Sequence, residues 1–174
     1  MLKTEKFLSN IDEDRFKVIL NHAIPSDTIS GVKVPDVVYW KFCDVMDVTE
    51  MNLIDAIESI LRIFSDKKID VMQTIAAEFV SFAKHVQNEF KKVSLLMEQI
   101  NSEPDPDLQA AGIDEMNKFG VLSIYYGISK NPLDWDAISE VAFHKIYSKL
   151  MMDKTSGEIQ ERYSKAVTDK MKRK

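Results

Sequence analysis

The sequence predicts an all-α protein of about seven helices, packed around one long central helix at about residues 69–100. Three observations support this fold class. The stretch Ile69–Ile100 contains neither Gly nor Pro. Its apolar residues recur at helical spacing. The whole chain of 174 residues has only five Gly and five Pro, which is few for a protein built from many strands and turns. No sheet is expected.

The central helix has a wide apolar face. Its members occupy three positions of each seven-residue repeat, and they are Met72, Ile75, Ala76, Phe79, Phe82, Ala83, Val86, Phe90, Val93, Leu96, Met97 and Ile100. A stripe of this width faces a globular core and is broader than a coiled-coil seam. At 1.5 Å per residue the helix would be roughly 48 Å long. One end is therefore expected to project or to pack on another molecule.

Two features qualify this helix. Ser65-Asp66 is expected to cap its start. Glu89 interrupts the apolar face, and two interpretations stay open: a carboxylate at the edge of the core that reaches water, or a buried carboxylate with a partner.

Four segments precede the central helix. Ser9 or Asn10 is expected to cap a first helix that Pro25 ends, and a loop with a turn at Gly31 follows. Residues 34–48 combine strand propensity with helical spacing, and helix is preferred. Thr49 is expected to start the next helix, which joins the central one in an antiparallel hairpin.

Three helices are expected after it. Asp105-Pro106 opens one that contains Gly112 and Gly120 and ends near Tyr126, with Gly127 in the C′ position. Asn131-Pro132 opens a second, which runs to about Leu150. The capping box Thr155-Ser156-Gly157-Glu158 opens the last, at about 156–174, which could extend as an arm.

Length and composition limit the class of protein. Residues 1–174 are expected to form a single helical domain. The net charge of −5 makes nucleic acid an unlikely partner. The longest apolar runs are too short to span a bilayer, so no membrane partner is expected. The lone Cys43 suits a reducing compartment.

No pattern of catalytic or ligating residues emerges. His22, His85 and His144 stand on different expected helices. Glu140 and His144 have the spacing for one edge of a metal site, but the two Glu-x-x-His motifs of a diiron bundle are absent from the sequence. Cys43 has no nearby His and is interpreted as a small buried hydrophobe. The sequence therefore predicts no catalytic residue, no cofactor, no metal and no enzymatic activity.

Protein contacts are the remaining kind of site. Tyr39-Trp40 and Tyr125-Tyr126 are adjacent aromatic pairs, so both rings of a pair cannot face one core from a helix. The end of the chain is basic. The candidate partner contacts are Trp40, Tyr125, Tyr126, Tyr163, Lys170, Lys172, Arg173 and Lys174.

The last 70 or so residues resemble a known class of protein in their general residue pattern and in the order of their expected elements. The segments that carry the resemblance are Ala111–Gly120, Gly127, Asn131–Trp135 and Tyr147–Leu150. They resemble the small helical morphogenesis proteins of tailed bacteriophages, which include helical tail assembly chaperones and the helical adaptors beneath the portal. The resemblance carries over no catalytic residue.

The resemblance implies a function by contact. It implies a non-enzymatic structural or assembly protein of the virion head–tail or tail region, assembled in the bacterial host cytoplasm. Its partners would be other phage structural proteins and further copies of itself in a ring. Two alternatives are a soluble tail assembly chaperone and a cytosolic regulatory or adaptor domain.

Overall fold

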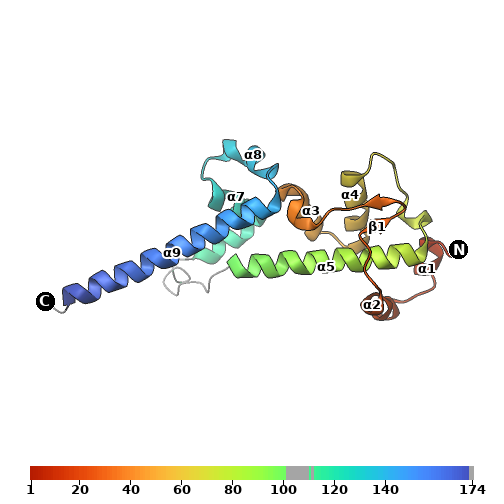
Figure 1. Cartoon of the computed structure of the whole chain (residues 1–174), viewed down its shortest axis with the longest axis horizontal. Coiled ribbons are helices and arrows are strands. Elements are labelled where there is room, and N and C mark those ends of the chain that lie inside the picture. The colour runs from red at the N-terminus through yellow and green to blue at the C-terminus, as the bar shows by residue number, and fades with distance from the viewer. Residues whose placement is uncertain (101–109, 111, 173–174) are drawn as a thin grey trace. The chain divides into compact units, whose positions relative to one another are not determined.

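The computed structural model describes residues 1–100, 110 and 112–172, and it is mostly helical (Figure 1). Its described residues contain one two-stranded sheet and two long helices, α5 at Ala76–Ile100 and α9 at Phe143–Lys172. The predicted all-α class with a long central helix, α5, is therefore confirmed. None of the described helices combines the length and the apolar character that crossing a lipid bilayer requires.

The chain divides into two compact units, Met1–Ser94 and Leu95–Lys174. The helix α5 runs through the division, and its first 19 residues, 76–94, belong to the N-terminal unit. The two units can still fold as one cooperative body, so the single domain at 1–174 stays a prediction.

The start of α5 is held by the N-terminus of the chain. Helix α1 at Thr4–Leu8 follows an isolated antiparallel bridge between Lys3 and Ile75. The Thr4 amide donates to the Thr74 carbonyl at 3.0 Å, and the two threonine hydroxyls, both buried, lie 2.9 Å apart. The sequence did not predict α1, because five residues are too short for a periodic pattern.

Helix α2 spans Glu13–His22, and its cap differs from the predicted one. The N-cap is Asp12, whose carboxylate accepts from the Arg15 amide at 2.8 Å. The prediction of Ser9 or Asn10 is wrong, because these residues end α1 instead. In the picture α2 and α4 lie on opposite sides of α5 (Figure 1).

A short hairpin corrects the prediction of no sheet. Strand β1 at Thr28–Ile29 pairs antiparallel with β2 at Val32–Lys33. The turn residues Ser30 and Gly31 have φ of 49° and 77°, which is the backbone of a tight hairpin turn. The predicted turn at Gly31 is confirmed, and two-residue strands are too short for an alternating pattern to reveal.

The next segment contains three elements where two helices were predicted. A 3₁₀ turn, η1, spans Val37–Tyr39, and α3 begins only at Phe42 and ends at Thr49. Helix α4 spans Leu53–Phe64. Thr49 was expected to start that helix, but the Asn52 side chain caps it by accepting from the amides of residues 54 and 55.

Helix α5 begins seven residues later than predicted. Ser65-Asp66 lies in the loop after α4, where the Ser65 hydroxyl accepts from the Lys67 amide, so it does not cap α5. A second 3₁₀ turn, η2, spans Val71–Gln73 and is capped by Asp70. The 25 residues of α5 make a helix about 38 Å long.

The predicted helix up to Tyr126 is interrupted. Its expected start at Asp105-Pro106 lies outside the described residues. A 3₁₀ segment, η3, spans Ile113–Phe119, and α7 spans Val121–Ile128. Gly112 and Gly120 were expected inside a helix, but both have positive φ and flank η3, and Gly127 lies inside α7 instead of at a C′ position.

The last two predicted helices are divided differently. Asn131 caps a 3₁₀ turn, η4, at Pro132–Asp134, and α8 at Trp135–Ser139 follows, so the predicted opening is confirmed. Helix α9 is then continuous over 30 residues, which makes it about 45 Å long. The predicted capping box at Thr155–Glu158 is wrong, because the Thr155 hydroxyl donates back to the Met151 carbonyl inside α9.

The core of the N-terminal unit lies between α5 and the elements around it. Its largest fully buried side chains are Phe42, Phe79, Phe82, Ile29, Ile57 and Ile60. In the C-terminal unit, the buried side chains Phe143 and Ile146 anchor the first turns of α9. The Tyr147 hydroxyl donates to the Gln99 side chain at 2.7 Å, which ties α9 to the end of α5.

Candidate interaction surfaces

The described residues hold no group of three or more His, Cys, Asp or Glu side chains that could bind a metal ion. Of the pair with metal-edge spacing in the sequence, Glu140 is the C-cap of α8 and His144 lies in the first turn of α9. Cys43 is half-buried, and its thiol lies 3.8 Å from Asp44 Oδ1. The remaining candidate sites are the surfaces of the two units.

Two carboxylates of the N-terminal unit attach η1 to α5. Glu89 Oε2 accepts from the Val37 amide at 2.8 Å, so Glu89 is a half-buried carboxylate with a backbone partner. Asp36 accepts from the Val38 amide and from Lys92 Nζ, which lies 2.7 and 2.5 Å from its two oxygens. Both contacts are structural, since they satisfy the free amides at the start of η1.

The surroundings of Asp36 act on its pKa in opposite directions. Partial burial raises the pKa, whereas the hydrogen bond from Lys92, the Val38 amide and the nearby positive charge lower it. The lowering contributions outweigh burial, so the pKa of Asp36 lies below its ordinary value.

One buried polar atom has no partner among the described residues. This atom is Nε2 of His85, on α5, whose ring lies 6.1 Å from the Phe82 ring. A buried nitrogen without a hydrogen bond lowers stability, although the His85 side chain as a whole is half-buried.

The adjacent aromatic residues divide as the sequence suggested, with one ring inside and one outside. Trp40 is 2% exposed; its Nε1 donates to the Pro35 carbonyl, and its ring packs on Phe64. Tyr39 is exposed. Trp40 was named as a candidate partner contact, but the structure places it in the core.

The second pair behaves in the same way. Tyr125 is buried, with its ring centroid 6.2 Å from that of Trp135, whereas Tyr126 is exposed. Tyr126 also lines an apolar pocket of about 470 Å³ in the C-terminal unit. Its other lining residues are Met116, Phe119, Leu122, Ser123 and Trp135. Tyr126 thus remains a candidate contact, and Tyr125 is a core residue.

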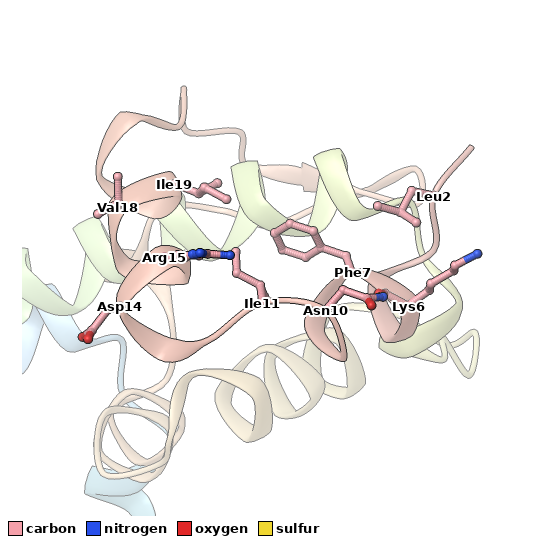
Figure 2. A pocket seen from close by; sticks show the side chains of 9 residues that line it. All are labelled: Leu2, Lys6, Phe7, Asn10, Ile11, Asp14, Arg15, Val18 and Ile19. Atoms are coloured by element: carbon pink, nitrogen blue, oxygen red, sulfur yellow. The ribbon is translucent and has the colours of Figure 1, made fainter.

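A larger apolar groove lies between α1 and α2, with a volume of about 520 Å³ (Figure 2). Its lining residues are Leu2, Lys6, Phe7, Asn10, Ile11, Asp14, Arg15, Val18 and Ile19. Figure 2 shows Asp14 at one end of this groove and Lys6 at the other, with Ile11 and Phe7 between them. We call it the α1–α2 groove.

Apolar surface continues from the groove onto α5. A second cavity, of about 750 Å³, shares Leu2, Phe7 and Ile19 with it and also touches Ala77 and Val80 of α5. Val18 is 58% exposed, although it is a β-branched apolar residue on a short helix. Exposed apolar surface of this extent is typical of a binding surface.

The sequence did not identify this groove. Its available signal was the breadth of apolar surface on α2, where Val18 and Ile19 lie beside Phe16 and Leu20 on a helix of only ten residues. Finding the groove also requires α1, which supplies Phe7.

The second half of α9 carries an exposed apolar stripe. Ile159, Tyr163 and Met171 are 54%, 68% and 66% exposed, and the half-buried Val167 completes a row at four-residue spacing. Lys170 and Lys172, at the end of the helix, are also exposed. We call residues 156–172 the α9 arm.

The arm includes most of the contacts that were predicted near the C-terminus. Tyr163, Lys170 and Lys172 lie on one continuous helix. Arg173 and Lys174 lie outside the described residues. Of the remaining candidates, Tyr126 is exposed on α7, whereas Trp40 and Tyr125 are buried.

Comparisons of the chain with protein-family models, curated proteins and solved structures gave no match.

Proposed function

We propose that this protein is a non-enzymatic structural or assembly subunit of a tailed bacteriophage. It would act in the head–tail or tail region through contacts with other phage proteins and with further copies of itself. The observation that carries the proposal is the apolar stripe of the α9 arm, which is left exposed on a continuous helix. The resemblance of residues 111–150 to helical phage morphogenesis proteins supplies the setting.

The energetics of the arm support a role in contact. Its apolar residues Ile159, Tyr163 and Met171 keep more than half of their surface in water. Burying apolar surface is favourable by about 25 cal/mol per Å². Covering the stripe with a partner would therefore lower the free energy of the arm. The rest of the arm is charged, with ion pairs such as Glu161–Lys165 on its exposed surface.

A tail assembly chaperone is a second candidate. The α1–α2 groove supports it, because an open, mostly apolar groove can hold an extended polypeptide segment. A chaperone would bind its client and be released, whereas a subunit would remain in the particle.

The first test is the mass of the purified full-length protein by light scattering, over a range of concentrations and salt. A structural subunit should give a closed multi-subunit species, or should form one with neighbouring gene products. A monomer that never assembles but binds an unfolded segment would favour the chaperone.

The second test locates the protein in cells that produce the particle. An antibody against the full chain should detect a structural subunit in purified particles and a chaperone only in the lysate. If the protein binds neither purified particles nor any particle protein, both candidate functions, structural subunit and chaperone, are contradicted.

A further inference from the structure

We infer that the α9 arm of one copy binds in the α1–α2 groove of a second copy. This inference rests on the proposed function, because it names the contact through which copies of such a subunit would join. One chain carries both halves of the contact: an open apolar groove in its N-terminal unit and an exposed apolar helix in its C-terminal unit.

The apolar surfaces correspond in kind. The groove floor presents Phe7 and Ile11 between its two ends, as Figure 2 shows, and Val18 borders it. The stripe presents Ile159 and Tyr163 from one side of a regular helix. An amphipathic helix that lays its apolar side into a groove is a recurrent mode of protein recognition.

The lengths also correspond. From Ile159 to Lys170 the arm rises about 17 Å, at 1.5 Å per residue. Helix α2, which forms one wall of the groove, has ten residues and is about 15 Å long. The stripe can therefore contact the whole groove without extending far past either end.

Charge gives the contact a direction. The first turn of α2 is acidic. Its Asp12 and Glu13 are ion-paired with Arg15 and Lys17, whereas Asp14 lines one end of the groove beside Arg15. The arm ends in the basic residues Lys170 and Lys172. Among these, Lys170 is about 20° around the helix from Ile159 and so lies on the side of the stripe. The favoured orientation places Lys170 at the Asp14 end of the groove.

This contact joins two different surfaces, so it is head-to-tail. A head-to-tail contact repeated from copy to copy closes into a ring or extends into a filament. A single helix in an open groove is at the small end of stable interfaces, which begin at roughly 1,200 Å². Association should therefore depend on concentration.

The test uses full-length variants in light scattering and analytical ultracentrifugation. Val18→Glu should disable the groove, and Tyr163→Glu should disable the arm. Each should weaken self-association by about tenfold or more, because each buries a charge in an apolar contact. Both residues are exposed, so the variants should keep the wild-type circular dichroism spectrum and melting temperature.

Matched controls place the same new charge beside each surface. Asn21→Glu lies on α2 but does not line the groove, and Thr168→Glu lies about 140° around α9 from Tyr163. Both controls should associate like the wild type. Equal losses in the controls and in the two disabling variants would overturn the inference.

Mixing the two disabled variants gives the sharpest result. Val18→Glu retains its arm and Tyr163→Glu retains its groove, so one intact contact can form between them. At a concentration where the weakened self-association leaves each variant alone monomeric, the mixture should give a 1:1 heterodimer that does not grow. If Val18→Glu still associates and mixing adds nothing, the arms pair with each other and the inference is wrong.

A charge exchange tests the direction. Asp14→Lys or Lys170→Glu alone should weaken association by about two- to fivefold, the range of an exposed ion pair, and the double variant should recover it. Failure of the double variant to recover would overturn the orientation. A wild-type chain that stays monomeric by itself overturns the inference. The proposed function survives that result if the chain is found in purified particles, and it is contradicted if the chain is absent from particles and binds none of their proteins.

Discussion

At the residue scale, a few polar side chains fix the backbone where elements meet. Asp12, Asp36, Asn52 and Asp70 each accept hydrogen bonds from amides at the start of a helix or a 3₁₀ turn. Asp36 adds a contact over a long sequence separation, because Lys92 on α5 binds the same carboxylate. Such residues attach a turn to a helix and fix their relative position.

Asp36→Asn should lower stability at neutral pH by less than about 1 kcal/mol, because the Lys92–Asp36 pair is partly exposed and screened by solvent. The variant keeps one oxygen for the Val38 amide and loses the negative charge and the second oxygen that binds Lys92. The pKa of Asp36 is lowered in the folded state, so its contribution is present above the unfolded pKa and is lost as the pH falls through the folded pKa.

Urea denaturation at several pH values measures this effect. The difference between wild type and Asp36→Asn should be full at pH 7, should begin to shrink near the ordinary aspartate pKa of about 3.9, and should vanish only below the lowered pKa of the folded state. A difference that grows on acidification would contradict the assignment.

Core packing at α5 is a second property of single residues. Phe79 is fully buried, and its ring lies 6.3 Å from that of Phe16 on α2. Phe79→Ala should cost about 3–5 kcal/mol of unfolding free energy, because it removes the ring and leaves a cavity. Ile159→Ala, on the exposed arm, should change the free energy by no more than about 0.5 kcal/mol in the same denaturation experiment.

At the element scale, two glycines of the C-terminal unit have opposite roles. Gly120 has φ 52° and ψ −131° and precedes α7, a conformation that L residues rarely adopt. Gly127 lies inside α7. In neither case would an added Cβ meet an atom within 4 Å, so backbone conformation decides the effect of a substitution.

Gly120→Ala should therefore destabilise the protein by about 1–3 kcal/mol, and Gly127→Ala should stabilise it by about 0.5–1 kcal/mol. Thermal melts of the two variants, followed by circular dichroism at 222 nm, measure both. Shifts of the same sign would show that α7 has a different start from the one described.

The continuity of α9 is a further property of an element. Gly157 lies in its interior, where an added Cβ would meet no atom within 4 Å, and the helix passes through it without a break. Gly157→Ala should raise helicity, whereas Gly157→Pro should separate the arm from the first half of α9. Residue 157 precedes Ile159, so residues 159–170 should stay helical in the proline variant. The variant should lose self-association only if the contact needs the arm to continue the first half of α9 without a break; association equal to wild type would contradict that need.

At the scale of the whole molecule, the two tryptophans report on different units. Trp40 is buried in the N-terminal unit, and Trp135 lies in the C-terminal unit, where its Nε1 donates to the Ser129 carbonyl at 3.0 Å. The variants Trp40→Phe and Trp135→Phe leave one fluorescent reporter each.

If residues 1–174 form one domain, both reporters should give the same midpoint in urea, because α5 continues through the two units. Circular dichroism on each variant supplies the control for altered stability. A fluorescence midpoint that differs from the circular dichroism midpoint of the same variant, in both variants, would show that the units unfold independently.

The sequence by itself determined the all-α class, the central apolar helix, the turn at Gly31 and the helix opening at Asn131-Pro132. These features depend on local spacing, on conformational preference and on side chains that bond to neighbouring amides. It also indicated that only one ring of each adjacent aromatic pair would face a core, since neighbouring residues on a helix point in different directions.

Only the tertiary structure decided where α5 and α9 begin, which ring of each pair is buried, and where apolar surface remains open. The start of α5 depends on the bridge from Lys3 to Ile75, which joins residues far apart in the sequence. The continuity of α9 overrides a local capping signal at Thr155–Glu158. The α1–α2 groove forms where two short helices pack side by side, and the periodic pattern within either helix cannot predict that packing.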